Sequence, residues 1–267
     1  MKTSGALNHI NKPSYPLKPK PMINTDQTLE QLNQLKLHGM AQAYGTTLAL
    51  PSHELPTAHE LMALLVDAEQ QSRTHQRTQM YLKLSNLRYD AVIEQIQCSV
   101  ERNITRNQLL ALADCNFIQR AENILITGST GCGKSYLACA FGRQAITLGY
   151  KTLYLGMNRF AEKLALAKLE GSYIKLLNQI EKIPLIIIDD FGLTPLDSQV
   201  RITLLQLLED RYGKRSTIIT SQLPVSKWHQ YINEPTLADA IMDRLSGSAH
   251  RFELKGESLR RKAIEKK

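Results

Sequence analysis

The sequence predicts an α/β fold, in which a five-stranded parallel sheet with flanking helices follows a small all-α N-terminal region. Three observations predict it. After Phe117, short apolar runs alternate with helical patterns, as is typical of parallel strands joined by crossover helices. One of these runs leads through a glycine-rich string into a helical pattern, and another ends in two aspartates. The segment before Phe117 shows helical spacing and capping signals.

The composition fits a folded globular protein. The 267 residues can hold two modest domains, and 43% of them are hydrophobic and 22% charged. No apolar run approaches the roughly 20 residues that a membrane helix requires, and residues 1–24 lack the apolar segment of a signal peptide. The four cysteines lack metal-ligand spacing and indicate reduced thiols. We therefore expect a cytoplasmic protein with no membrane contact.

The net charge of +8 lies in the two ends of the chain. Residues 1–24 carry four lysines, four prolines and no acid, and residues 255–267 carry six Lys or Arg against two Glu. The remaining 23 basic and 23 acidic residues cancel. We expect a disordered basic tail at 1–24 and a basic tail at 255–267. They would act as electrostatic arms for an anionic polymer or, alternatively, only as solvated ends.

Residues 25–115 are predicted to form a helical N-terminal domain. Apolar residues keep helical spacing from Thr25 to Gly45. Capping boxes, in which a Thr is followed three residues later by Glu or Gln, mark later helix starts at Thr57 and Thr105.

The helix that starts at Thr57 becomes basic towards its end. Arg73, Arg77 and Lys83 have spacings that could place them on one face. Such a face could bind phosphates, and a solvated helix surface is the alternative.

The core domain is predicted at residues 116–254. Its strands are expected at 123–127, 151–155, 185–189, 216–220 and 250–254. Two helices, from Asn158 and from Ser172, follow the second strand, although a plain crossover needs only one.

The first core strand leads into the spacing Gly-x4-Gly-Lys-Ser of a Walker A loop. Glycines let successive backbone N–H groups turn towards phosphate oxygens, and the following helix adds its partial positive charge. Lys134 is expected to reach the β- and γ-phosphates of ATP, and Ser135 to bind Mg²⁺. The expected nucleotide-binding residues are Gly128, Ser129, Thr130, Gly131, Cys132, Gly133, Lys134, Ser135 and Tyr136.

Asp189 and Asp190 follow four apolar β-formers, which is the Walker B pattern. Asp189 is expected to bind Mg²⁺ with Ser135, and Asp190 to orient and polarise the attacking water. A pair of helix N-caps is the alternative. The fourth strand ends in Ser221 and Gln222, either of which would face the γ-phosphate as a sensor or simply form a turn.

Arg244 lies in a predicted helix in which positions three and four residues away hold no acid. We expect no acidic partner for it on its own helix. An unpaired arginine there would act as an arginine finger on the γ-phosphate of a neighbouring subunit. The alternative is an arginine that pairs elsewhere in its own subunit or faces water. The expected catalytic residues are Lys134, Asp190, Ser221, Gln222 and Arg244.

These motifs resemble those of the IstB-like AAA+ ATPases, helper proteins of insertion-sequence transposases that are related to DnaC-type helicase loaders. The resemblance runs from about Leu29 to the C-terminus. Beyond the two phosphate motifs, it is carried by Thr220-Ser221-Gln222-Leu223-Pro224, Asp243-Arg244-Leu245 and Lys255-Gly256-Glu257-Ser258.

The resemblance implies an AAA+ core that binds ATP and Mg²⁺ at the interfaces of a homo-oligomer, with an N-terminal domain for oligomerisation and DNA binding. It also implies ATP-driven assembly on duplex DNA that recruits and stimulates the transposase of the same element. The paired helices at 158–182 would line a DNA channel. This channel would give Arg159, Lys163, Lys168 and Lys175 a role in DNA binding.

Many AAA+ enzymes have glutamate where Asp190 stands, so the resemblance implies ATP hydrolysis that is slow and stimulated by DNA. A DnaC-type helicase loader is the main alternative, and a P-loop kinase for a small molecule is a more distant one. The sequence lacks the Asn-Lys-x-Asp or Thr-Lys-x-Asp string with which GTPases read guanine. An ATP-dependent scaffold without hydrolysis stays open because of Asp190.

Overall fold

The computed structural model describes residues 25–259, which form two compact units divided between Arg73 and Thr74. The predicted tail at 1–24 and residues 260–267 of the C-terminal tail lie outside the described residues. The division differs from the boundary predicted between residues 115 and 116. Buried apolar residues between Ala91 and Ile118 pack into the core of the second unit, as described below.

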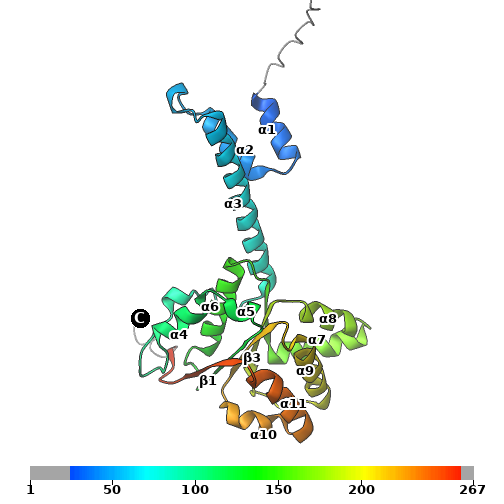
Figure 1. Cartoon of the computed structure of the whole chain (residues 1–267). Coiled ribbons are helices and arrows are strands. Elements are labelled where there is room, and N and C mark those ends of the chain that lie inside the picture. Colours follow the sequence, from blue (N-terminus) through cyan, green and yellow to red (C-terminus); the bar gives the residue numbers. More distant parts are fainter. Residues whose placement is uncertain (1–24, 260–267) are drawn as a thin grey trace, which may run out of the picture. The chain divides into compact units, whose positions relative to one another are not determined.

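The described part of the first unit is helical (Figure 1). The single helix pattern predicted from Thr25 to Gly45 is interrupted at Lys36, whose φ of 60° is left-handed and ends the first helix. The elements of this unit are α1 (Thr25–Gln34), α2 (His38–Leu48), the 3₁₀ turn η1 (Ser52–Glu54) and the first part of α3 (Ala58–Ser85).

Glu69 of α3 fixes the start of α2. Its carboxylate accepts hydrogen bonds from the backbone N–H groups of Gly39, at 2.9 Å, and of Met40, at 3.2 Å. A Cβ at Gly39 would lie 2.4 Å from the carbonyl oxygen of Ala68, so the close approach of the two helices requires glycine. The side-chain hydrogen bond from Arg73 Nε, at 2.7 Å, helps to hold the pKa of Glu69 below its usual value.

Both predicted capping boxes are confirmed. The backbone N–H of Thr57 donates to Glu60 Oε2 at 2.8 Å at the start of α3. Thr105 and Gln108 form the reciprocal pair at the start of α4 (Arg106–Ala113). Each box satisfies N–H groups that the first helical turn leaves without backbone partners.

The second unit is built on a sheet of five strands in the order β2-β3-β4-β1-β5, and every pair of neighbours is parallel. All five predicted strands are confirmed. The strands are β1 (Asn123–Gly128), β2 (Thr152–Gly156), β3 (Leu185–Phe191), β4 (Ser216–Ser221) and β5 (Ala249–Leu254).

Helices cover both faces of this sheet (Figure 1). Ile124 and Ile126 of β1 enter the core on one face, and Leu125 enters the core on the other. Both faces of the inner strands are thus buried, which explains their continuous apolar sequences. The helices after β1 are α6 (Lys134–Thr147), α7 (Met157–Leu169), α8 (Tyr173–Glu181), α9 (Ser198–Arg211), the 3₁₀ turn η3 (Val225–Lys227), α10 (Trp228–Ile232) and α11 (Pro235–Ser246).

The segment between α3 and β1 belongs to the core of the second unit. It contains the 3₁₀ turn η2 (Ile93–Gln95), α4 and α5 (Asn116–Gln119). Ile104, Leu109 and Phe117 are buried in the same cluster as the inner residues of α6. Its capping box and helical spacing resembled those of the preceding helices, and only tertiary packing distinguishes the two regions.

Among residues 25–259, none of the helices combines the length and apolar character that crossing a bilayer requires.

Arg211, the last residue of α9, is almost fully buried, with 1% of its surface exposed. Its guanidinium donates to the carbonyl oxygens of Ile183, at 2.7 Å, and Ser216, at 2.5 Å, and also to those of Ile180 and Glu181. The carbonyls of Ile180 and Glu181 lie at the end of α8, and those of Ile183 and Ser216 lie at or just before the amino ends of β3 and β4. Arg211 therefore ties α8 and α9 to that edge of the sheet.

We expect Arg211→Ala to lower the free energy of unfolding by about 3 kcal/mol or more, because it leaves several buried carbonyl groups without a donor. Chemical denaturation of the full chain measures this change. Arg215→Ala is the matched control, since Arg215 is exposed, and its expected effect is within about 0.5 kcal/mol. Equal stability of the two variants would contradict this role of Arg211.

Candidate nucleotide site

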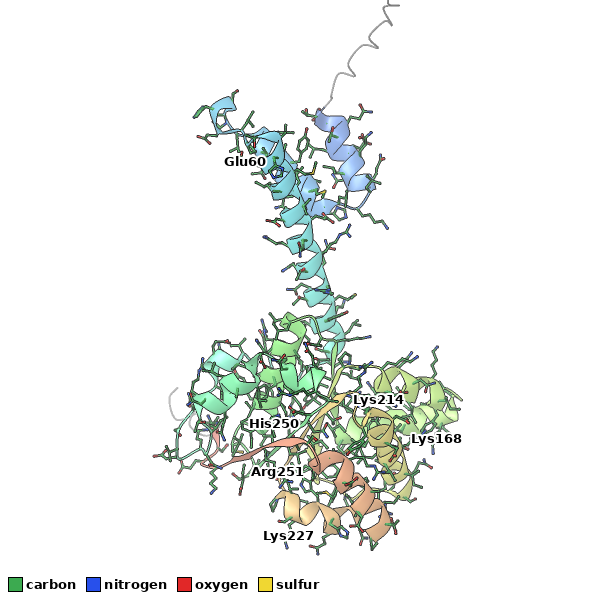
Figure 2. All side chains as sticks on the ribbon, in the orientation of Figure 1. Glu60, Lys168, Lys214, Lys227, His250 and Arg251 are labelled. Atoms are coloured by element: carbon green, nitrogen blue, oxygen red, sulfur yellow. The ribbon has the colours of Figure 1, made fainter. Side chains whose placement is uncertain are left out.

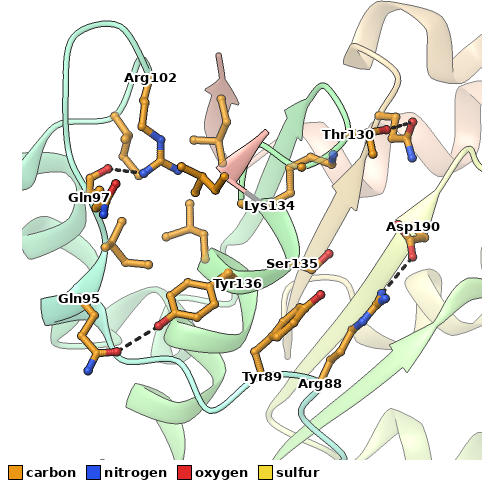
Figure 3. A pocket seen from close by; sticks show the side chains of 18 of the residues that line it. Arg88, Tyr89, Gln95, Gln97, Arg102, Thr130, Lys134, Ser135, Tyr136 and Asp190 are labelled. Carbon is orange, nitrogen blue, oxygen red and sulfur yellow. Dashed lines mark hydrogen bonds and ion pairs between the residues drawn. The ribbon is translucent and has the colours of Figure 1, made fainter. Parts of the chain in front are cut away.

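A cavity of about 960 Å³ lies where β1 and β3 end (Figure 3). Ligands in open parallel sheets bind at this edge, outside the carboxyl ends of the strands. The loop after β1 and the start of α6 form one wall of the cavity, with Thr130, Gly131 and Lys134. Asp190 and Gln222, from the ends of β3 and β4, line it as well.

Glycine is required in the loop for both conformation and space. Gly131 and Gly133 have φ values of 82° and 96°, which side chains disfavour. A Cβ at Gly128 would lie 2.3 Å from the carbonyl oxygen of Leu254. The loop therefore begins in close contact with the end of β5, and its N–H groups can turn towards a bound anion.

The first two residues of α6 are Lys134 and Ser135. Lys134 is 6% exposed and lines the cavity, and its Nζ donates to the carbonyl oxygen of Ser129 at 2.9 Å. Ser135 Oγ donates to Asp189 Oδ1 at 2.8 Å. The Walker A serine and the first Walker B aspartate thus meet as predicted.

Asp189 is fully buried and is held by three hydroxyl groups. Ser135 and Thr220 donate to its Oδ1, and Tyr154 donates to its Oδ2. Burial raises the pKa of Tyr154, and the neighbouring Asp189 carboxylate acts in the same direction, so this hydroxyl remains a donor. Tyr154 and Thr220 were not predicted, because their contact with Asp189 depends on the order of the strands.

Asp190 takes a left-handed backbone conformation, with φ of 62°, at an irregularity in the pairing of β3 with β4. Its backbone N–H donates to Thr220 Oγ1 at 3.2 Å. The irregularity allows two consecutive aspartates to serve one site. Asp189 points into the buried hydroxyl cluster, while Asp190 lines the cavity.

The two sensor candidates occupy different surroundings. Gln222 lines the cavity, and its Oε1 accepts a hydrogen bond from Thr130 Oγ1 at 2.8 Å. Ser221 is buried, donates to the carbonyl oxygen of Phe191 at 2.5 Å and accepts from the N–H of Leu223 at 3.1 Å. Gln222 therefore lies in the cavity lining, whereas the hydroxyl of Ser221 bonds to the backbone at the ends of β3 and β4.

Cys132 lies within the loop but does not face the cavity, because its side chain is fully buried in the core below. Tyr136 lines the cavity, and its hydroxyl donates to Gln95 Oε1 at 3.1 Å. The rings of Tyr136 and Tyr89 lie 6.0 Å apart. Of these two predicted nucleotide-binding residues, Tyr136 therefore lines the cavity and Cys132 packs in the core.

The segment that follows α3 supplies cavity residues that the sequence did not reveal. Arg88, Tyr89, Gln95 and Arg102 all line the cavity (Figure 3). Arg102 donates to the carbonyl oxygens of Gln97, at 2.5 Å, and Cys132, at 2.9 Å, and so ties this segment to the loop. No local motif marks these residues, because the fold alone brings them to the loop.

The described part of the predicted C-terminal tail also reaches the cavity. The N–H of Leu259 donates to the carbonyl oxygen of Gly131 at 3.0 Å, and its side chain lines the cavity. Leu259 is therefore part of the cavity lining.

Arg244 lies away from this cavity. Asn123, the first residue of β1, donates to the carbonyl oxygen of Arg244 at 3.0 Å. Because β1 has six residues, the loop begins about 16 Å away, at the other end of the strand. Arg244 also forms ion pairs with Glu209 of α9, at 2.8 Å, and with Asp243, at 3.4 Å. The prediction of no acidic partner on its own helix is wrong, because Asp243 is the preceding residue.

The basic residues proposed to bind DNA are exposed, and they fall into two groups. Arg73 and Arg77 belong to α3, and Arg73 is engaged with Glu69. The others lie on α7 and α8, where Lys168 is at the outer surface of the second unit (Figure 2). Those on α7 and α8 are Arg159, Lys163, Lys168 and Lys175.

The parallel sheet, the glycine loop and the paired aspartates define an ATP-binding protein of the AAA+ class. The chain belongs to the family described as "IstB-like ATP binding protein", which it matches over residues 30–267. It is 43% identical over 234 residues to a protein of Sinorhizobium fredii named as an insertion sequence ATP-binding protein, covering 88% of this chain and 96% of the relative. It is 39% identical to the corresponding protein of IS1162 from Pseudomonas fluorescens, over 76% of this chain and 88% of that one.

Solved structures show the same fold. The replication initiator DnaA bound to AMPPCP and single-stranded DNA superposes with a TM-score of 0.54 at 20% identity, covering 68% of this chain and 55% of that one. The DnaC helicase loader superposes with a TM-score of 0.52 at 19% identity, covering 62% of this chain and 98% of that one.

Proposed function

We propose that this protein hydrolyses ATP, assembles in its ATP-bound form on duplex DNA, and there recruits and stimulates the transposase of the same insertion sequence. The observation that carries the ATPase part is the position of Asp190, which lines one cavity with Lys134. Membership of the IstB-like family, with relatives named after insertion sequences, supports the link to transposition.

The residues around Asp189 suit a Mg²⁺ ion that arrives with the nucleotide. Ser135 Oγ and the Asp189 carboxylate offer oxygen ligands at one point, and Mg²⁺ in such sites takes few protein ligands beside phosphate and water. Across residues 25–259, no three His, Cys, Asp or Glu side chains gather as a metal site of their own. When bound, the ion would neutralise charge between the β- and γ-phosphates.

In the proposed reaction, Lys134 exchanges its contact with Ser129 for the β- and γ-phosphates. Asp190 orients a water molecule and accepts its proton as the water oxygen attacks the γ-phosphorus. The bond to the bridging oxygen breaks, and ADP leaves with that electron pair. Gln222, which accepts a hydrogen bond from Thr130, would sense the terminal phosphate.

The surface of α7 and α8 supports the DNA part of the proposal. Lys163, Lys168 and Lys175 are exposed there, and Leu169 and Ile174, which flank the turn between the helices, are 86% and 72% exposed. Cations of this kind bind the phosphate backbone without regard to sequence, and exposed apolar residues at a helix turn can contact sugars or bases.

We expect DNA affinity, measured with an ATP analogue by fluorescence anisotropy, to fall about 100-fold between about 50 and 200 mM salt if four phosphates are contacted. Combining Lys163→Gln with Lys168→Gln should reduce the log–log salt slope by about 2. The matched control combines Lys214→Gln with Lys227→Gln, which removes two exposed lysines elsewhere on the unit (Figure 2).

Light scattering of the same samples reports assembly, which is expected only with duplex DNA and the ATP analogue together. An affinity that does not depend on salt, or an equal effect of the control pair, would contradict the assigned surface. Tight binding to a replicative helicase without affinity for duplex DNA would instead favour a helicase loader.

A further inference from the structure

The guanidinium of Arg88 lies beside both Walker B carboxylates. Its Nη1 is 3.6 Å from Asp189 Oδ2 and 3.5 Å from Asp190 Oδ2. Figure 3 shows the ion pair with Asp190. Arg88 comes three residues after the end of α3, in the segment that lines the cavity. The subunit that contains the cavity therefore also supplies an arginine beside the expected position of the γ-phosphate of ATP.

The guanidinium is supported and yet accessible. Its central carbon lies 5.5 Å from the centre of the Tyr89 ring, a distance at which a cation is attracted to the ring face. The side chain is 46% exposed and lines the cavity. The group can therefore reorient towards a ligand without disturbing the core.

The other two cations of the cavity lining are held differently. Arg102 donates to the carbonyl oxygens of Gln97 and Cys132, and Lys134 donates to that of Ser129. Both of these cations are thus held by backbone carbonyl groups, whereas Arg88 lies beside the two Walker B carboxylates, of which Asp189 would bind the metal.

Binding of Mg²⁺ with ATP would change the charge that Arg88 faces. A dication at Ser135 and Asp189 would repel the guanidinium, while the terminal phosphate would bring negative charge and several acceptor oxygens into the same cavity. Arginine suits such a partner, because its planar fork can donate two parallel hydrogen bonds. ADP would offer no such group at that place.

We propose that Arg88 distinguishes ATP from ADP by transferring its guanidinium from the Asp189 and Asp190 carboxylates to the γ-phosphate. This assignment rests on the proposed ATP and Mg²⁺ site and gives it a nucleotide-sensing residue. It makes Arg88 a direct ligand contact supplied in cis, distinct from an arginine supplied by another subunit.

Calorimetric titration of the full chain with ADP and with a non-hydrolysable ATP analogue, both with Mg²⁺, tests the proposal. Arg88→Gln is expected to weaken binding of the analogue by about 10- to 100-fold, the range for hydrogen bonds to charged groups, and to change ADP binding less than about threefold. Arg88→Lys keeps the charge but loses the fork, so an intermediate loss is expected.

Arg143→Gln is the matched control. Arg143 forms an ion pair with Asp90, two residues after Arg88, but does not line the cavity. The affinities of the Arg143→Gln protein for ADP and for the ATP analogue should stay at the wild-type values. A thermal unfolding scan of each variant confirms that the chain is folded, and Arg88→Lys supplies the measurement if Arg88→Gln does not fold.

An unchanged ratio of the two affinities in Arg88→Gln would overturn the proposal. Tighter binding of the analogue would also overturn it, because Arg88 would then only neutralise the carboxylates and compete with the metal. If wild-type protein bound neither nucleotide, the proposed ATPase itself would fail, so the two failures are distinguishable.

Discussion

Lys134→Ala is expected to abolish ATP binding, with an affinity loss of at least about 100-fold. Lys134 is the cation at the start of α6, and it lines the cavity beside the glycine loop. An ammonium group on phosphate makes charge-assisted hydrogen bonds, which are about twice as strong as neutral ones. Alanine also leaves no group that can follow the charge as it develops on the γ-phosphate.

Titration with ATP and Mg²⁺ measures the loss. Lys151→Ala is the control, because Lys151 is exposed just before β2 and lies outside the cavity lining. Lys134 donates a hydrogen bond to the carbonyl oxygen of Ser129 in the loop itself, so a thermal unfolding scan is needed to show that the variant stays folded. Unchanged ATP affinity in a folded Lys134→Ala protein would remove the cavity as the nucleotide site.

Arg244→Ala is expected to leave ATP binding nearly intact while reducing hydrolysis about 1,000-fold, the lower end for loss of an arginine finger. ATP-dependent assembly should be lost with it. Arg244 lies at the amino end of β1, too far to reach its own cavity, so any contact with a γ-phosphate has to be made in a neighbouring subunit.

Glu209→Gln separates this role from a structural one. It removes the ion pair that holds Arg244 within its own subunit and leaves the arginine in place. If Arg244 is an arginine finger, Glu209→Gln protein should keep its ATPase activity. If Arg244 is needed only for its ion pair with Glu209, both Glu209→Gln and Arg244→Ala should lose that activity.

Mixing two inactive variants tests whether Arg244 acts on the cavity of a neighbouring subunit. Arg244→Ala protein keeps an intact cavity, and Lys134→Ala protein keeps an intact arginine. Mixing the two is expected to restore part of the ATPase activity, because some interfaces then contain both residues. No recovery on mixing, with both proteins folded, would count against a shared site.

The sheet and its two phosphate motifs could be predicted because their signals are local. Four apolar β-formers before Asp189 indicate a covered strand, and the spacing from Gly128 to Ser135 indicates an anion-binding loop. The positions of the five strands followed from the same kind of pattern. These features depend on neighbouring residues and need no knowledge of distant contacts.

The remainder of the site depends on tertiary packing. Arg88 and Arg102 belong to a segment whose helical signals resembled those of the preceding helices, so the predicted domain boundary differs from the division between the two units. Thr220 reaches Asp189 although the following two residues were the expected sensors. The pairing of Arg244 with Glu209 could not be found from its own helix alone, because Glu209 lies 35 residues away on α9.

The parallel sheet places the nucleotide cavity at one edge and Arg244 at the other. In the proposed assembly, each subunit contact is therefore heterologous, because it joins the cavity surface of one subunit to the Arg244 surface of the next. A row of such subunits is polar. An open row would leave a cavity without an arginine at one end and an arginine without a cavity at the other. Growth and disassembly could then differ between the two ends, as they do in other directional polymers.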